Sequence, residues 1–254
     1  RNKPDRITHG DYYSPDNGNE PWEVVHVDKV FLEMTASGND SAMVFICRFC
    51  RDIMALPCSP TVDSVGYLNM ILFSLIPQNG VPRCIVSDRG SMLISRLVKT
   101  VFKILGITSV ALDSHTHRGV GVCERFNHTL RDIARATYYD NHYQWDCMLP
   151  LIVFAYRTTL HTATGSQPFY SNHGRHARQP FEGITGNTAL QMMSSSPHAY
   201  VQRQLPILHA AWAVSRSNLL TAERKHAARH HKRYGAHRRS ITYEVGDLVL
   251  ILQK

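Results

Sequence analysis

Short runs of β-branched and aromatic residues alternate with longer stretches of helical periodicity along this chain. The first three runs, at residues 24–32, 42–46 and 53–56, are joined by short turn-forming links, which predicts an antiparallel three-strand meander. Two further runs, at 84–86 and 107–112, predict two additional strands. The predicted fold class is therefore α/β, a mixed sheet flanked by helices.

The segments between and after these runs have the spacing of helices. Apolar residues recur every three to four positions, and the first two patterns stop at Pro77 and at Gly106, residues that end helices. A last, mostly helical segment carries a basic run at its end. The predicted helices span 65–75, 97–105, 123–138, 145–161 and most of 198–236.

The composition changes along the chain and predicts four parts. We expect an irregular N-terminal segment at 1–20, a compact core at 21–180, a mostly helical linker with the basic run at 181–239, and the first strand of a truncated module at 240–254. The chain starts without Met or an apolar leader, so we expect a fragment of a longer, non-secreted protein.

The overall composition is that of a globular protein. Apolar residues make up 43% and charged residues 19% of the 254 residues, which argues against wholesale disorder. No apolar run reaches the roughly 18 residues of a membrane-spanning helix, so we expect no membrane partner. The six cysteines are scattered, which favours a reducing, intracellular compartment.

Positive charge is concentrated near the C-terminal end. The formal net charge is +8, and residues 216–239 hold eight Lys or Arg against one Glu. This asymmetry favours a polyanionic partner, although a solvated basic helix or a nuclear-import patch has the same composition. The side chains of this run that we expect to contact DNA phosphates are Arg224, Lys225, Arg229, Lys232, Arg233, Arg238 and Arg239.

Three acidic residues lie at strand ends or at the start of a helix. Asp28 lies on the first predicted strand, Asp88 follows the fourth, and Glu124 opens a predicted helix after 35 intervening residues. Carboxylates brought together in this way bind two Mg²⁺ ions in phosphodiester chemistry. From spacing alone, three ordinary surface acids remain the alternative.

Several motifs, in order, resemble the catalytic core of Gypsy-type LTR-retrotransposon integrases, which are retroviral-like. The resemblance runs from about residue 20 to 180 and includes the 35-residue spacing between the second and third acids. The matching segments are Pro21 to Asp28, Gly80 to Gly90, Leu105 to Ile107, Glu124 to Leu130, Trp145 to Tyr156 and His161 to Arg175. The tail from Tyr243 to Leu250 looks like the entrance to that family's small C-terminal β-barrel.

The resemblance implies an RNase H-like fold and a polynucleotidyl transferase. Such an enzyme trims the 3′ ends of element DNA and joins them to target DNA, with Asp28, Asp88 and Glu124 as catalytic residues that bind two Mg²⁺ or Mn²⁺ ions. The implied partners are the element ends, the target duplex and further copies of the chain. The implied location is the nucleus or a virus-like particle.

The helix that begins near Glu124 carries further candidates for DNA contact. Positions three, four, seven and eleven residues after the glutamate share its face of a helix. These positions hold Asn127, His128, Arg131 and Arg135, and the alternative for them is a solvated polar face.

Two other functions share the same residues. Residues 113–123 lack the family's prolyl stretch and contain two glycines, which favours a degenerate or domesticated integrase domain that only binds nucleic acid or protein. An RNase H-type hydrolase of RNA–DNA hybrids shares the fold and the metals.

Cys47 and Cys50 form a lone CxxC pair, and because a structural zinc site needs four ligands we expect no zinc here.

Overall fold

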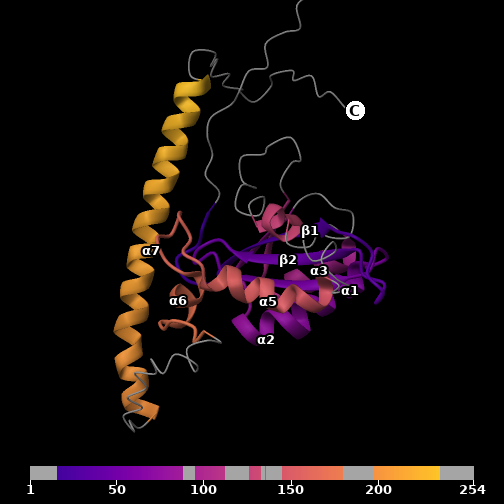
Figure 1. Cartoon of the computed structure of the whole chain (residues 1–254), viewed down its shortest axis with the longest axis horizontal. Coiled ribbons are helices and arrows are strands. Elements are labelled where there is room, and N and C mark those ends of the chain that lie inside the picture. The colour runs from indigo at the N-terminus through magenta and orange to yellow at the C-terminus, as the bar shows by residue number, and fades with distance from the viewer. Residues whose placement is uncertain are drawn as a thin grey trace, which may run out of the picture.

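A computed structural model of the chain describes most of the predicted core and the long C-terminal helix (Figure 1). Among the described helices, none combines the length and the apolar character needed to cross a bilayer. The described residues are 16–87, 95–111, 126–132, 135, 145–179 and 197–234.

A five-stranded mixed sheet forms the centre of the molecule, as predicted. The strand order is β3-β2-β1-β4-β5; β1 pairs antiparallel with β2, β2 pairs antiparallel with β3, and β1, β4 and β5 run parallel. The meander predicted from the first three apolar runs is therefore correct. The strands are β1 (Val24–Phe31), β2 (Ser41–Cys47), β3 (Ile53–Cys58), β4 (Cys84–Ser87) and β5 (Thr108–Ala111).

Helices connect the strands that run parallel, because a parallel pair cannot be closed by a tight turn. Between β3 and β4 lie α1 (Ser64–Met70), a π-helical turn η1 (Ile71–Leu75) and α2 (Ile76–Asn79), and between β4 and β5 lies α3 (Arg96–Leu105). Asp63 caps α1 through the backbone N–H groups of residues 65 and 66. Gly106 ends α3 in the left-handed conformation, at the predicted stop.

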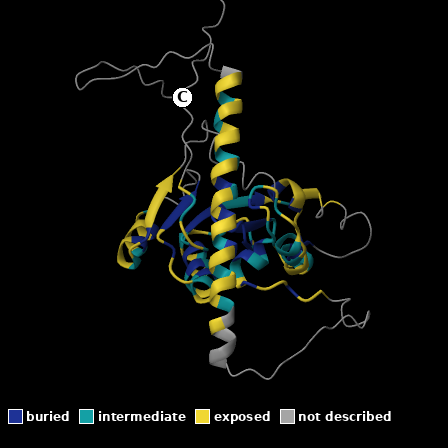
Figure 2. Cartoon of the chain, turned by 90° about the vertical axis from the view of Figure 1, so that its left-hand side faces the viewer, coloured by how far each residue is buried: buried dark blue, intermediate teal, exposed yellow. Residues whose placement is uncertain are grey.

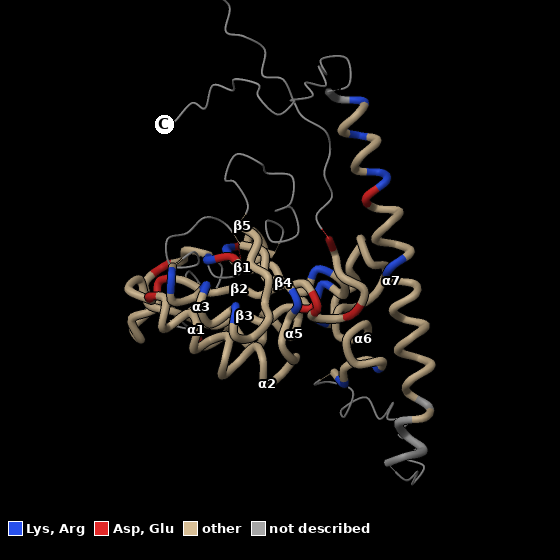
Figure 3. Tube along the Cα trace, turned by 180° about the vertical axis from the view of Figure 1, so that it is seen from behind, with Lys and Arg blue, Asp and Glu red and all other residues tan. Residues whose placement is uncertain are grey.

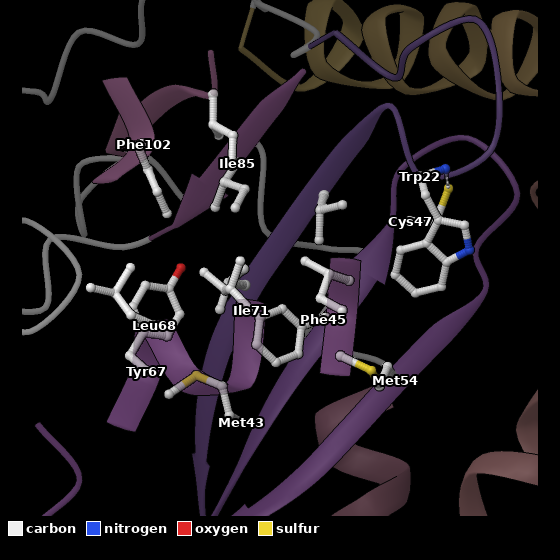
Figure 4. Packing of buried hydrophobic residues seen from close by; sticks show 14 of the residues in the cluster. Trp22, Met43, Phe45, Cys47, Met54, Tyr67, Leu68, Ile71, Ile85 and Phe102 are labelled. Carbon is white, nitrogen blue, oxygen red and sulfur yellow. Dashed lines mark hydrogen bonds between the residues drawn. The ribbon is translucent and has the colours of Figure 1, made fainter. Parts of the chain in front are cut away.

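The main apolar core lies between one face of the sheet and these connecting helices (Figure 4). Alternate residues of β1 point to opposite faces, so Val25 and Val27 enter this core while their neighbours do not. Phe45 stacks against Tyr67 with ring centroids 6.5 Å apart. The π-helical turn was not predicted; it keeps both Ile71 and Leu75 buried.

A second apolar cluster covers the opposite face. It joins Val30 and Val44 of the sheet to α5 (Trp145–Thr158) and to the helical segment 126–132. The indole N–H of Trp145 donates to the Glu33 carbonyl at 2.7 Å, which fixes the start of α5 next to the carboxyl end of β1. This helix ends at Thr158, three residues earlier than predicted.

Two C-terminal helices pack beside the sheet. The short helix α6 (Pro168–His173), which was not predicted, lies between α5 and α7 (Pro197–Tyr234), a 38-residue helix that continues through Pro206 (Figure 1). One side of α7 contacts the body: Ser215 and Ser171 share a hydrogen bond of 3.2 Å. Because Leu219 of the same side joins the main apolar cluster, part of the predicted linker belongs to the core.

A buried carboxylate ties the β2–β3 turn to α5 and α6. The side chain of Asp52 is fully buried and accepts two hydrogen bonds from the Arg157 guanidinium, at 2.6 and 2.8 Å. The Asn172 amide donates a third, at 2.7 Å. These partners satisfy the charge that burial would otherwise make costly.

We predict that Asp52→Ala lowers the free energy of unfolding by about 3 kcal/mol, because it leaves the Arg157 guanidinium without its buried counter-charge. Urea denaturation followed by tryptophan fluorescence measures the change. The matched control is Glu33→Ala, which removes an exposed carboxylate and is expected to change stability by no more than about 0.5 kcal/mol. Equal losses in both variants would contradict this account of the turn.

Candidate active site

Asp28 lies near the middle of the sheet, on the face covered by α5 and segment 126–132. It shares this face of β1 with the buried Val30, whereas its neighbour Val27 points to the opposite face, and Asp28 is itself half-buried. In the antiparallel register it stands opposite Val44. Asp28 is thus a partly accessible carboxylate held on a rigid central strand.

The end of β4 lies beside the position of Asp28 on β1. Val27 stands opposite Ser87, the last residue of β4. The next residue along each strand is one of the predicted acids, Asp28 and Asp88. Asp88 and Glu124 both lie outside the described residues, so their roles stay predictions.

The helical segment 126–132 is fixed against the sheet by its apolar side. Phe126 and Leu130 are fully buried, and the Phe126 ring contacts Tyr156 of α5 edge to face, with centroids 5.1 Å apart. These contacts hold the segment directly over the Asp28 face of β1.

Asn127 contacts Asp28 directly. Its amide Nδ2 donates to the Asp28 Oδ2 at 2.6 Å, and only 5% of the residue is exposed. Its Oδ1 is buried and has no hydrogen-bond partner among the described residues. Asn127 was predicted on an exposed DNA-contacting face, and the structure places it against the sheet instead. The reason is its position next to Phe126, which turns this flank of the helix inward.

The other residues predicted for this helix are exposed. The imidazole Nδ1 of His128 lies 2.7 Å from the Asp132 carboxylate one turn later, and Arg131 and Arg135 face solvent. Their predicted contact with DNA remains a prediction. The sequence spacing was sufficient to place these three on the outer face, but it did not separate them from Asn127.

His26 precedes Asp28 on the same face of β1 and is electrostatically different. Burial, together with the nearby Arg48 and Arg51 guanidinium groups, lowers the pKa of His26 to about 4. The ring is therefore neutral at pH 7 and adds no positive charge beside Asp28. Nothing in the sequence pattern indicated this buried, neutral imidazole.

The basic run forms the C-terminal end of α7, which extends beyond the body of the molecule (Figures 1 and 3). We call residues 224–234 the basic arm. Its surface is mostly exposed in Figure 2. Arg224, Lys225, Arg229 and Lys232 are exposed; Arg233 lies in the helix, with a side chain outside the description, and Arg238 and Arg239 lie beyond the described residues.

Asp28 supplies the kind of donor that a hard divalent cation prefers, an accessible carboxylate oxygen. Within the ranges that the structure describes, no group of three or more His, Cys, Asp or Glu residues is arranged to hold a metal. Two of the three predicted ligands, however, fall outside those ranges. The described CxxC thiols, Cys47 and Cys50, are fully buried, and Cys47 Sγ accepts the backbone N–H of Trp22 at 3.1 Å.

Comparison with known sequences connects the chain to LTR retrotransposons. No family model matches it. It is 25% identical over 222 residues, 87% of the chain, to the retrovirus-related Pol polyprotein from transposon 412 of Drosophila melanogaster. It is 22% identical over 153 residues, 60% of the chain, to the transposon Tf2-3 polyprotein of Schizosaccharomyces pombe. The chain spans 17% and 12% of the lengths of these relatives.

Comparison with solved structures shows an integrase catalytic-core fold. The chain matches the simian T-cell lymphotropic virus intasome in complex with the PP2A regulatory subunit B56 gamma, with a TM-score of 0.59 and 17% identity over 70% of this chain and 63% of that one. It matches the HTLV-2 integrase catalytic core domain in complex with magnesium with a TM-score of 0.50 and 14% identity, over 61% of this chain and 98% of that one. The RNase H-like fold and the resemblance to retrotransposon integrases are therefore confirmed.

We predict that Asn127→Leu lowers the free energy of unfolding by about 2 kcal/mol in metal-free buffer, because it removes a buried hydrogen bond to a carboxylate. Thermal or urea denaturation measures the change. The neighbouring His128→Leu is the control and is expected to be nearly neutral, since its ion pair is exposed. An unchanged stability of the Asn127 variant would show that the contact with Asp28 contributes nothing.

Proposed function

We propose that this chain is the catalytic part of a retroelement integrase, which processes the 3′ ends of element DNA and transfers them to target DNA. The observation that carries the proposal is the position of Asp28, a half-buried carboxylate on the central strand that is held by Asn127 and lies one residue beyond the β1 position opposite the end of β4. The integrase-core fold and the retrotransposon relatives support it.

The register of the sheet supports Asp88 as the second catalytic carboxylate. Asp88 directly follows β4, whose last residue lies beside Val27 on β1. Glu124 precedes Asn127 by three residues, about one helical turn, which favours a third carboxylate near Asp28. In this proposal the three acids converge although they are far apart along the chain.

Two Mg²⁺ or Mn²⁺ ions are the proposed cofactors, held by Asp28, Asp88 and Glu124. When bound, such ions activate the attacking oxygen and stabilise the leaving oxygen of a phosphodiester. The buried Asn127 Oδ1 is an oxygen acceptor without a described partner, and it suits a hydrogen bond from water in a cation's shell. Asn127 Nδ2 orients the Asp28 carboxylate for this task.

The proposed partners are the two element ends and a target duplex. Joining two ends at nearby points requires at least two active sites, so we propose that the chain works as a homo-multimer. The exposed cations of the basic arm would bind phosphates with little sequence preference. The proposed place of action is the nucleus or a virus-like particle.

We predict that Asp28→Asn and Asp88→Asn each reduce strand transfer by at least about a hundredfold, because each removes a metal-binding charge. The assay uses labelled element-end duplexes and supercoiled target, with Mg²⁺ or Mn²⁺. Asp132→Asn removes an exposed acid near the site and serves as the matched control, with activity near that of the native chain.

The outcome of the strand-transfer assay distinguishes an integrase from a domain that only binds and from an RNase H-type hydrolase. Transfer that survives both substitutions would contradict the proposed site. A folded chain with complete termini that shows no transfer would favour a degenerate domain that only binds nucleic acid or protein. Cleavage of RNA–DNA hybrids without transfer would favour an RNase H-type hydrolase.

We predict that replacing Arg224, Lys225, Arg229 and Lys232 by Gln weakens binding to duplex DNA and reduces its salt dependence. Because this variant lacks four phosphate-binding cations, the slope of log K against log salt should become shallower by about 3.6. Fluorescence anisotropy between 50 and 200 mM KCl measures it. The weakening should be the same for unrelated duplex sequences, and an effect confined to one sequence would contradict backbone binding.

A further inference from the structure

A second basic surface lies around α6, away from the basic arm. No acidic residue occurs between Asp146 and Glu182, whereas this stretch contains three arginines and three histidines. Four of these cationic or titratable residues are exposed and lie at the end of α6 or just after it. We call them the α6 basic surface: His173, Arg175, His176 and Arg178.

Aromatic rings of α6 hold two consecutive members of this surface. The Arg175 guanidinium lies 5.3 Å from the centroid of the Phe169 ring, and that of Arg157 lies 5.4 Å from the same ring. The next residue, His176, stacks on Tyr170 with centroids 4.7 Å apart and an interplanar angle of 24°. Two neighbouring cation-forming side chains are thus laid over two neighbouring rings.

A glycine makes this arrangement possible. Gly174 ends α6 with φ of 68°, which turns the chain back so that the following residues lie over the helix. A Cβ atom at this position would approach Leu208 of α7 to 2.8 Å. The turn is therefore fixed both by its backbone conformation and by its contact with α7.

Arg157 and Arg175 differ in their ion pairing. Arg157 is bound to the buried Asp52 and donates to His173, so its Nε and Nη2 groups are used within the protein. Arg175 and Arg178 form no ion pair with a carboxylate in the part of the chain that the structure describes. Stacking already restricts the Arg175 side chain, which lowers the entropy cost of binding a ligand.

We propose that the α6 basic surface is a second binding site for the sugar–phosphate backbone of duplex DNA. Arg175 and Arg178 contact phosphates, and Phe169 holds Arg175 in place. The proposal rests on the proposed function, because it names a further contact for the same DNA. An acidic protein segment is the competing ligand, and the test separates the two.

The location of this surface favours a continuous duplex. Helix α5 lies beside both sites: Tyr156 contacts Phe126 of the segment that carries Asn127, and the next residue, Arg157, lies over the Phe169 ring. The whole helix has 14 residues and is about 20 Å long. A duplex of about six base pairs covers that length, so one DNA molecule can reach both sites.

The test measures DNA binding by the full chain in metal-free buffer. Binding is detected by the fluorescence anisotropy of a labelled 25-base-pair duplex in 50–200 mM KCl. The Arg175→Gln/Arg178→Gln double variant is expected to bind about tenfold more weakly at 100 mM KCl, with a salt slope lower by about 2. The matched control is Lys99→Gln/Lys103→Gln, which removes two exposed charges from α3. We expect its slope of log K against log salt to equal that of the native chain.

A third variant tests the role of the ring. Phe169→Leu keeps every charge but removes the surface on which Arg175 lies, so we expect several-fold weaker binding with an unchanged salt slope. Circular dichroism melts confirm that each variant is folded.

The outcomes are distinct. If the native chain binds no DNA, the proposed function fails together with this inference. If it binds DNA and the double variant keeps the slope of the α3 control, the inference alone is overturned. If the double variant instead loses binding to polyglutamate and retains DNA binding, the surface recognises acidic protein segments and the proposal is wrong.

Discussion

The parallel pairing of β1 with β4 constrains the rest of the structure. Parallel neighbours require connections that leave the sheet, and here the helices α1, α2 and α3 make those connections while covering one face with apolar side chains. The same pairing places Ser87, the last residue of β4, beside Val27 of β1, one residue before Asp28. The Asp28 carboxylate is thus held in the rigid centre of the sheet while its side chain stays partly accessible.

The opposite face combines packing with polar contacts that serve the site. Segment 126–132 is seated by Phe126 and Leu130, and the same seating directs Asn127 onto Asp28. Exposed cations lie on several elements: Arg131 and Arg135 belong to the helical stretch beside Asp28, and others lie on the basic arm and just after α6. The proposed DNA contacts therefore extend from the element next to Asp28 to the two C-terminal helices.

Local patterns were sufficient to predict most of the fold. The strands β1 to β3 and the end of α3 at Gly106 depend on neighbouring residues, and they were predicted correctly. Helix α6 was missed because its six residues are too few for a periodic pattern, and its position depends on α7. The environments of Asn127 and Asp52 depend on partners about a hundred residues away, which spacing within a helix or turn cannot reveal.

The contribution of α7 to the core has a practical consequence for dissecting this protein. Leu219 fills the same apolar cluster as Val25 and Phe45, and the Trp212 indole is hydrogen-bonded to α6 at 2.9 Å. A shortened polypeptide that stops at residue 180 would expose that hydrophobic surface to water and invite aggregation. Recombinant fragments for crystallisation or NMR should therefore retain the helix at least through Leu219.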